Sequence, residues 1–217
     1  SSPPIVVYQE SVKGANPTEF EGKSPNKHNK FYFIVSPLED SVKEAIRKSE
    51  IDVDAKIKDP KALAKQLKDL GMSDVEAKGV VAFHNNNVLI DCTKGVQYLH
   101  ETMELVKQAF DEAMNRGPLA AEKIAGVKVC LMDAKLHEDT IHRGPAQIIP
   151  AVRDGIYGAM CQAGRILLEP MQKLFISVPP DYMGGAVNLI NQRRGTILEM
   201  GQEGADSPVT AEVPVAD

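Results

Sequence analysis

The sequence contains no tryptophan, and aromatic residues make up only 5% of its 217 residues. Proteins that read single-stranded RNA commonly stack the bases on exposed aromatic rings, so a stacking platform of that kind is not expected here. No apolar run approaches the roughly 18 residues that a membrane helix needs, so no membrane partner is expected. A surplus of basic residues is also missing, because the net charge is −5. Any contact with RNA must therefore come from a local basic patch.

Cysteine is scarce as well, with three residues at positions 92, 130 and 161. Their number is odd, their spacing is wide, and each lies in an apolar stretch, so the pattern does not indicate a disulfide framework. We expect three buried free thiols in a reducing compartment. Hydrophobic residues make up 43% of the chain and charged residues 25%, which is the usual balance of a globular protein. We therefore expect a soluble, cytoplasmic protein.

Hydrophobic periodicity predicts a chain of mixed α+β class. Runs of β-branched and apolar residues predict strands at 5–12, 31–35, 87–92 and 127–136. Apolar residues three or four apart, together with N-cap patterns, predict helices at 39–49, from 59, from 73, at 95–115 and at 144–163. The segment between the first two strands is rich in Gly, Asn, Pro, Ser and Lys and is predicted to be a polar loop.

The pattern changes after Glu169-Pro170. A strand at 174–178, a helix at 183–194 and strands at 196–200 and 209–215 are predicted from there on. A two-layer domain of this kind normally needs a second helix and a fourth strand to cover its sheet. We therefore expect that the chain ends inside this second domain and is a piece of a longer protein.

A cluster of titratable residues lies between the strand at 127–136 and the helix at 144–163. His137 and His142 flank Glu138 and Asp139. The familiar zinc-binding pair of a helix places two histidines four residues apart on one face, but these two are five apart, so the spacing does not favour a metal site. The same four residues could instead serve acid–base chemistry in a small-molecule enzyme, although no second constellation defines a substrate pocket.

The position of His142 and Arg143 next to a helix start also needs a reason. The helix dipole disfavours positive charge at an N-terminus, so this placement costs stability and indicates a surface role towards an anionic partner. Residues 22–30 contain three lysines and one histidine but no acid. This segment is either a solvated turn or a loop in which each lysine neutralises an RNA phosphate and releases counterions.

Four motifs occur in order along the chain: SPNKHN at 24–29, DCTKGVQYL at 91–99, LHEDTIHRG at 136–144 and QIIP at 147–150. Together they resemble elongation factor 2, the family of ribosomal translocases of archaea and eukaryotes. The resemblance covers nearly the whole chain. The sequence GPAQ at 144–147 is similar to the archaeal branch of that family.

The resemblance implies a domain organisation. Residues 1–169 resemble domain IV, an α+β fold like the second domain of ribosomal protein S5, with tip loops at 22–30 and 137–144. Residues 170–217 resemble the first part of domain V, which has a ferredoxin-like fold and is truncated here. The GTPase domain, with its GTP and Mg²⁺, would lie outside this chain. The chain itself is then expected to contain no catalytic residue, cofactor or metal.

The resemblance also assigns roles to residues. His142 matches the histidine that the family converts to diphthamide, the target of ADP-ribosylating toxins. The tip is expected to contact RNA through Lys23, Lys27, His28, Lys30, His137, Asp139 and Arg143. The implied partners are the decoding centre of the ribosome with its tRNA, mRNA and ribosomal RNA, the diphthamide-synthesising enzymes, the toxins, and the remaining domains of the parent protein. A small-molecule enzyme that uses the cluster at 137–142 stays the alternative, which a tight pocket would favour and an exposed convex tip would oppose.

Overall fold

The computed structural model describes residues 2, 5–202 and 204–216, and the chain divides into two compact units. The larger unit is Gln9–Leu167. The smaller unit combines Leu168–Asp217 with Ser1–Tyr8. Both units contain helices and sheets, so the expected α+β class is confirmed.

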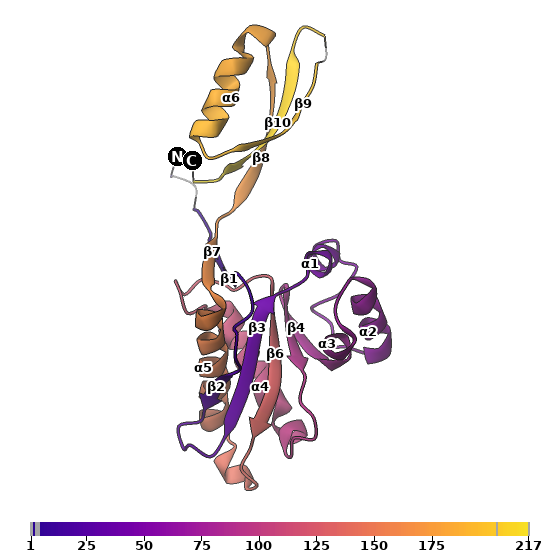
Figure 1. Cartoon of the computed structure of the whole chain (residues 1–217), viewed down its shortest axis with the longest axis vertical. Coiled ribbons are helices and arrows are strands. Elements are labelled where there is room, and N and C mark those ends of the chain that lie inside the picture. The colour runs from indigo at the N-terminus through magenta and orange to yellow at the C-terminus, as the bar shows by residue number, and fades with distance from the viewer. Residues whose placement is uncertain (1, 3–4, 203, 217) are drawn as a thin grey trace. The chain divides into compact units, whose positions relative to one another are not determined.

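A five-stranded sheet forms the centre of the larger unit (Figure 1). In spatial order its strands are β2 (Phe20–Lys23), β3 (Lys30–Pro37), β6 (Val127–Lys135), β5 (Asn87–Asp91) and β4 (Val80–His84). Neighbouring strands are antiparallel except β5 and β6, which are parallel. The β5–β6 connection is therefore a crossover, and it contains a long helix, as parallel pairing requires.

Two long helices pack on one face of this sheet, α4 (Leu99–Asn115) and α5 (Pro145–Ala163). The core between them is dominated by fully buried side chains, among them Phe31, Phe33, Phe110, Ile148 and Ile156. Strand β2 lies very close to α5, since a Cβ on Gly22 would come within 2.0 Å of the Ala151 carbonyl oxygen. Only glycine fits there, so this residue sets the distance between β2 and the helix.

Three short helices, α1 (Asp40–Arg47), α2 (Pro60–Asp69) and α3 (Asp74–Gly79), enclose a second core with strands β5 and β6. Lys128 of β6 connects this layer to the sheet, because its ammonium group pairs with Glu39 before α1 and with Glu76 of α3 at 2.7 Å. Burial acts to lower the pKa of Lys128, but the hydrogen bonds that it donates to both carboxylates outweigh this effect and the pKa is raised. The lysine is therefore held in its charged form.

The smaller unit has the topology of a split βαβ motif. Its elements are β8 (Met171–Val178), η2 (Pro180–Tyr182), α6 (Met183–Gln192), β9 (Thr196–Met200) and β10 (Ser207–Pro214). Strand β10 lies between β8 and β9 and is antiparallel to both. This is the arrangement of the first strands of a ferredoxin-like domain, as expected. Its core contains Val178, Ile190, Val209, Ala211 and Val213.

Several local predictions were wrong. The predicted polar loop contains β2, and the strand expected at 5–12 is only β1 (Gln9–Val12), which pairs with β7 (Arg165–Leu168). Helix α4 begins at Leu99 and not at 95, because Tyr98 has a φ of +67°, outside the helical region. Of the three thiols only Cys130 is buried, since Cys161 is exposed and Cys92 half-buried.

Among the described residues, no helix combines the length and apolar character that a bilayer crossing requires.

Candidate functional site

Two loops meet at one end of the larger unit (Figure 1), the β2–β3 connection at 24–29 and the β6–α5 connection at 136–144. We call them, together with Lys23 and Lys30 that flank the first loop, the tip. The first loop is closed by its own backbone, because Ser24 N donates to Asn29 O at 2.9 Å and Lys27 N to Ser24 O at 2.8 Å. Lys27 has a φ of +64°, a conformation that costs a non-glycine residue about 1 kcal/mol. The hairpin geometry therefore fixes where this lysine emerges.

Asn29 joins the two loops. It is fully buried, its side-chain Nδ2 donates to the His142 carbonyl oxygen at 2.8 Å, and its Oδ1 accepts from His137 N at 3.1 Å. Asn26 donates to the same His142 carbonyl at 3.0 Å, and its own N–H is bound by Gln147 Oε1 at 2.8 Å. The backbone at 137 and 142 is thus held by residues more than a hundred positions earlier in the chain.

Three histidine rings lie together at the tip. The ring centroids of His137 and His142 are 4.4 Å apart, and His28 is 4.9 Å from His137 and 4.8 Å from His142. The family resemblance implied that these loops gather at one tip, and the structure brings them into contact there. His137 Nδ1 accepts the N–H of Asp139 at 3.0 Å, so the ring proton of a neutral His137 is on Nε2.

Asp139 caps the turn that presents His142. Its Oδ1 accepts from Ile141 N at 3.1 Å at the start of η1 (Thr140–His142). Ile141 is 77% exposed, so this turn projects from the surface and His142 follows on it, half-buried against the other two rings. The carboxylate of Asp139 therefore has a local structural partner, whereas that of Glu138 is exposed without a described one.

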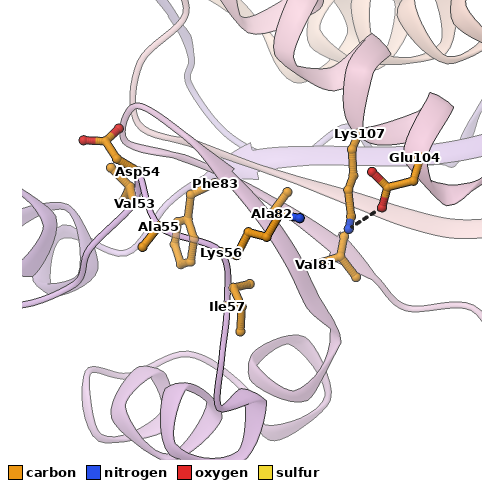
Figure 2. Close-up of a pocket in the computed structure, with 10 residues that line it drawn as sticks. All are labelled: Val53, Asp54, Ala55, Lys56, Ile57, Val81, Ala82, Phe83, Glu104 and Lys107. Carbon is orange, nitrogen blue, oxygen red and sulfur yellow. Dashed lines mark hydrogen bonds and ion pairs between the residues drawn. The ribbon is translucent and has the colours of Figure 1, made fainter.

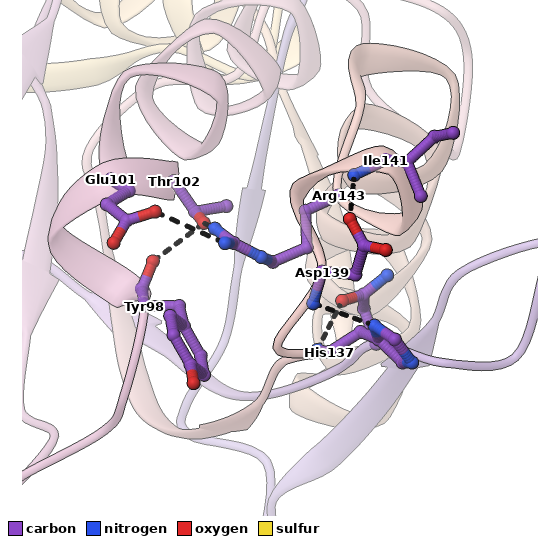
Figure 3. Close-up of polar contacts among 8 residues, drawn as sticks. Tyr98, Glu101, Thr102, His137, Asp139, Ile141 and Arg143 are labelled. Carbon is purple, nitrogen blue, oxygen red and sulfur yellow. Dashed lines mark hydrogen bonds and ion pairs between the residues drawn. The ribbon is translucent and has the colours of Figure 1, made fainter.

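Arg143 does not lie at the surface, which corrects the expectation that it contacts RNA. Its side chain is only 4% exposed and turns inward to the first turn of α4 (Figure 3). There it donates to Glu101 Oε2 and Thr102 Oγ1, each at 3.2 Å, and its guanidinium lies 4.8 Å from the centre of the Tyr98 ring. The dipole at the start of α5 disfavours the positive charge of Arg143. The Glu101 carboxylate and the face of the Tyr98 ring offset this effect.

The lysines of the tip differ in their exposure and in whether an acidic side chain lies close to them. Lys23 and Lys27 are exposed. Lys30 is half-buried, and its ammonium group lies 3.9 Å from the Glu21 carboxylate. Lys23 and Lys30 face each other across the β2–β3 ladder. Positive charge is therefore present at both the base of the hairpin and its turn, but Lys30 is partly neutralised.

The hollows described in the larger unit lie away from the three histidines of the tip, His28, His137 and His142. The hollow in Figure 2 is lined by residues 53–57, three residues of β4, and Glu104 and Lys107 of α4. A second one is lined by Val81, by Asp91, Thr93, Gly95 and Val96 after β5, and by one face of α4 that includes His100 and Lys107. Neither includes a residue of 137–142, and Glu138, Asp139 and Ile141 are exposed. This projecting arrangement opposes the small-molecule enzyme. Within the described residues, no group of three or more His, Cys, Asp or Glu side chains is arranged to hold a metal ion.

Sequence reasoning missed the residues that hold the tip together. Asn26 and Asn29 were within the SPNKHN motif, but asparagines in a lysine-rich segment usually indicate a solvated turn. Gln147, Glu101 and Thr102 gave no signal, because their partners at 26 and 143 are distant in sequence.

Comparison with known proteins identifies the class of these domains. The family model "Elongation factor G, domain IV" matches residues 50–164, and the model "Elongation factor G C-terminus" matches residues 166–217. The two units are therefore domains of a translation elongation factor.

The relatives define the family more closely. Over 217 residues the chain is 57% identical to elongation factor 2 of Picrophilus torridus and 58% identical to that of Thermoplasma acidophilum. Over 216 residues it is 52% identical to elongation factor 2 of Thermococcus kodakarensis. Each alignment covers the whole chain but only 29% of the relative. The chain belongs to the elongation factor 2 family and is of the archaeal type.

A solved structure supports the fold. A crystal structure of a protein from Thermus thermophilus aligns with 99% of this chain and 26% of its own length, with a TM-score of 0.59 and 21% sequence identity. At this level of identity the likeness concerns the arrangement of the elements.

Proposed function

We propose that the tip of the larger unit enters the decoding centre of the ribosome and contacts the paired tRNA and mRNA while the parent factor drives GTP-dependent translocation. One observation carries this proposal most directly: the structure fixes the His142 backbone inside an exposed turn, between His28 and His137, with Lys27 beside them on the 24–29 loop. Such an arrangement presents polar and cationic groups outward, and the hollows described for the larger unit are lined by residues other than 137–142.

The charge distribution supports a contact that is confined to the tip. The chain carries a net charge of −5, so most of its surface is repelled by ribosomal RNA. Lys23 and Lys27 are exposed on the tip, where they attract phosphates. Contacts to phosphate and ribose carry no sequence information, which suits a factor that must move every codon. In this proposal Lys23, Lys27, His28, Lys30 and His142 hold codon and anticodon together during movement.

His142 is, in this proposal, the residue that is converted to diphthamide. The modification extends the ring at the carbon between its two nitrogens, so the imidazole must be reachable by an enzyme. The exposed turn around Ile141 supports such access. Diphthamide-synthesising enzymes and ADP-ribosylating toxins are then partners of this turn, and the site of action is the cytoplasm.

In this proposal the chain contacts RNA and contributes no catalytic residue. The relatives are more than three times as long as this chain, which spans 29% of their length. We assign GTP and Mg²⁺ to the GTPase domain of the full-length protein, and ribosome binding to all of its domains together.

Frame maintenance by the full-length factor tests the proposal. Lys27→Gln and His142→Gln remove one contact each, and Lys65→Gln is the matched control, because Lys65 is an exposed lysine of α2. We expect both tip variants to raise the frequency of frameshifting in a translation assay, with the control at the wild-type level. Unchanged frame maintenance in both tip variants would contradict the proposal.

A further inference from the structure

We propose that Asn29, assisted by Asn26, is the positioning residue that sets where His142 stands on the tip. The consequence for modification and RNA contact rests on the proposed function, but the positioning itself does not. Asn29 touches neither an RNA nor an enzyme in this account, because its side chain is fully buried. It acts through the backbone of His137 and His142.

The amide of Asn29 is matched to its partners at both ends. Its Nδ2 faces the carbonyl oxygen of His142, which can only accept, and its Oδ1 faces the N–H of His137, which can only donate. The two partners therefore fix the orientation of the amide. One side chain thereby fixes two points of the 136–144 loop, five residues apart, relative to the 24–29 loop.

Both acceptor sites of the His142 carbonyl are used. Asn29 donates to it at 2.8 Å and Asn26 at 3.0 Å. A carbonyl oxygen has two lone pairs, so this atom is fully satisfied by asparagines of the neighbouring loop. The imidazole of His142 then lies against His28 and His137 as a consequence of where its backbone is held.

The isosteric change Asn29→Asp separates positioning from packing. The carboxylate keeps the shape and the acceptor for His137 N–H, but it places an oxygen opposite the His142 carbonyl, where the donor had been. Repulsion replaces the hydrogen bond to His142, and the longer contact of Nδ2 with Ser24 Oγ, at 3.3 Å, also loses its donor. We expect the 136–144 loop to open more often and the His142 ring to leave its contact with His28 and His137.

Asn16→Asp is the matched control. Asn16 is also a buried asparagine, with Nδ2 donating to Thr18 O at 2.7 Å and Phe33 O at 3.1 Å and Oδ1 accepting from Val35 N at 2.8 Å. It has the same kind of bonds, but all of its partners lie outside the tip. Asn26→Asp is the second test variant, because Asn26 is only half-buried and its loss is less damaging to the fold.

The readout is the rate at which diethyl pyrocarbonate acylates His142 in the 217-residue chain, resolved from His137 by tandem mass spectrometry. Loss of one hydrogen bond, about 1 kcal/mol, raises the open population about fivefold. We expect the His142 rate to rise at least about threefold in Asn29→Asp and to a smaller extent in Asn26→Asp. In Asn16→Asp the melting temperature is expected to fall with the His142 rate unchanged. A wild-type rate in folded Asn29→Asp and Asn26→Asp, or an equal rise in Asn16→Asp, would overturn the positioning role.

A second arm separates this role from the proposed function. Full-length wild-type and Asn29→Asp proteins are treated with diphthamide-synthesising enzymes, and the mass of the peptide with His142 is measured. Modified wild type with a clearly lower yield in Asn29→Asp supports both proposals. Equal yields would mean that the positioning by Asn29 does not matter for modification of His142. An unmodified wild type would contradict the proposed function. In both cases the acylation rates still test whether Asn29 positions His142.

Discussion

In two loops of the larger unit, one fully buried polar side chain binds several backbone groups, but by different chemistry. In the loop at 117–122, the fully buried Glu10 carboxylate accepts the N–H groups of Leu119, Ala120 and Glu122 at 2.6, 3.2 and 2.9 Å. In the tip, the neutral amide of Asn29 accepts one N–H and donates to one carbonyl.

The difference follows from what each loop presents. A carboxylate binds backbone N–H groups more strongly than an amide does, because a charged acceptor strengthens the bond. At the tip, however, one of the two partners is the His142 carbonyl oxygen, which needs a donor that an ionised carboxylate does not have. An amide holds the loop without adding charge. The loop at 117–122 has no such constraint, and there the stronger acceptor is used.

The largest effect is expected at Glu10. Glu10→Ala leaves three N–H groups of the 117–122 loop without their charged acceptor, and we expect it to lower the free energy of unfolding by about 3 kcal/mol. Urea denaturation measures this change. Glu19→Ala is the control, since Glu19 is exposed, and it should shift the free energy by less than about 0.5 kcal/mol. A loss no larger than that of the control would show that the two loops do not differ as described.

A smaller loss is expected at Arg143, the neighbour of His142 that points inward. Arg143→Ala removes the bonds to Glu101 and Thr102, and we expect a loss of about 2 kcal/mol in the free energy of unfolding, because Glu101 is largely solvated. Arg143→Lys should recover part of it, since a lysine keeps the charge but loses the planar contact with Tyr98. If Arg143→Ala kept full stability but bound RNA more weakly, this would indicate that the Arg143 side chain lies at the surface and contacts RNA.

The smallest effect on stability, but a clear one on binding, is expected at Lys27. Lys27→Gln should change the free energy of unfolding by less than about 0.5 kcal/mol. If Lys27 contacts a phosphate, the slope of log affinity against log salt for a base-paired RNA should decrease in magnitude by about 1. Fluorescence anisotropy at several salt concentrations measures this slope. Lys65→Gln should leave it unchanged, and an equal decrease in both variants would mean that the tip has no special role.

The sequence predicted the main elements of the fold because their signals are local. The helix of α4 and the strands of β3, β5 and β6 all follow from hydrophobic periodicity and from runs of β-branched residues. Strand β2 was missed because its four residues, Phe20–Lys23, include only one large apolar side chain. Its place is set by the glycine contact with α5, which no local pattern shows.

The candidate site was predicted in part for the same reason. The motifs placed His142 and the lysine loop, and the convergence of the loops followed from the family resemblance. The inward turn of Arg143 was not predictable, because its partners lie some forty residues earlier on α4. Its charge and its place beside a helix start had indicated a surface role, but the buried guanidinium pairs with Glu101 and Thr102 of α4 instead.

The proposed role of the tip is tested most directly by the modification state of His142 in the cells that make this protein. Mass spectrometry of the peptide that covers 136–144 reads this state without any variant. We expect a peptide whose added mass, that of diphthamide, maps to His142 and not to His137. An unmodified His142 in the natural protein, or a modification that maps to His137, would contradict it.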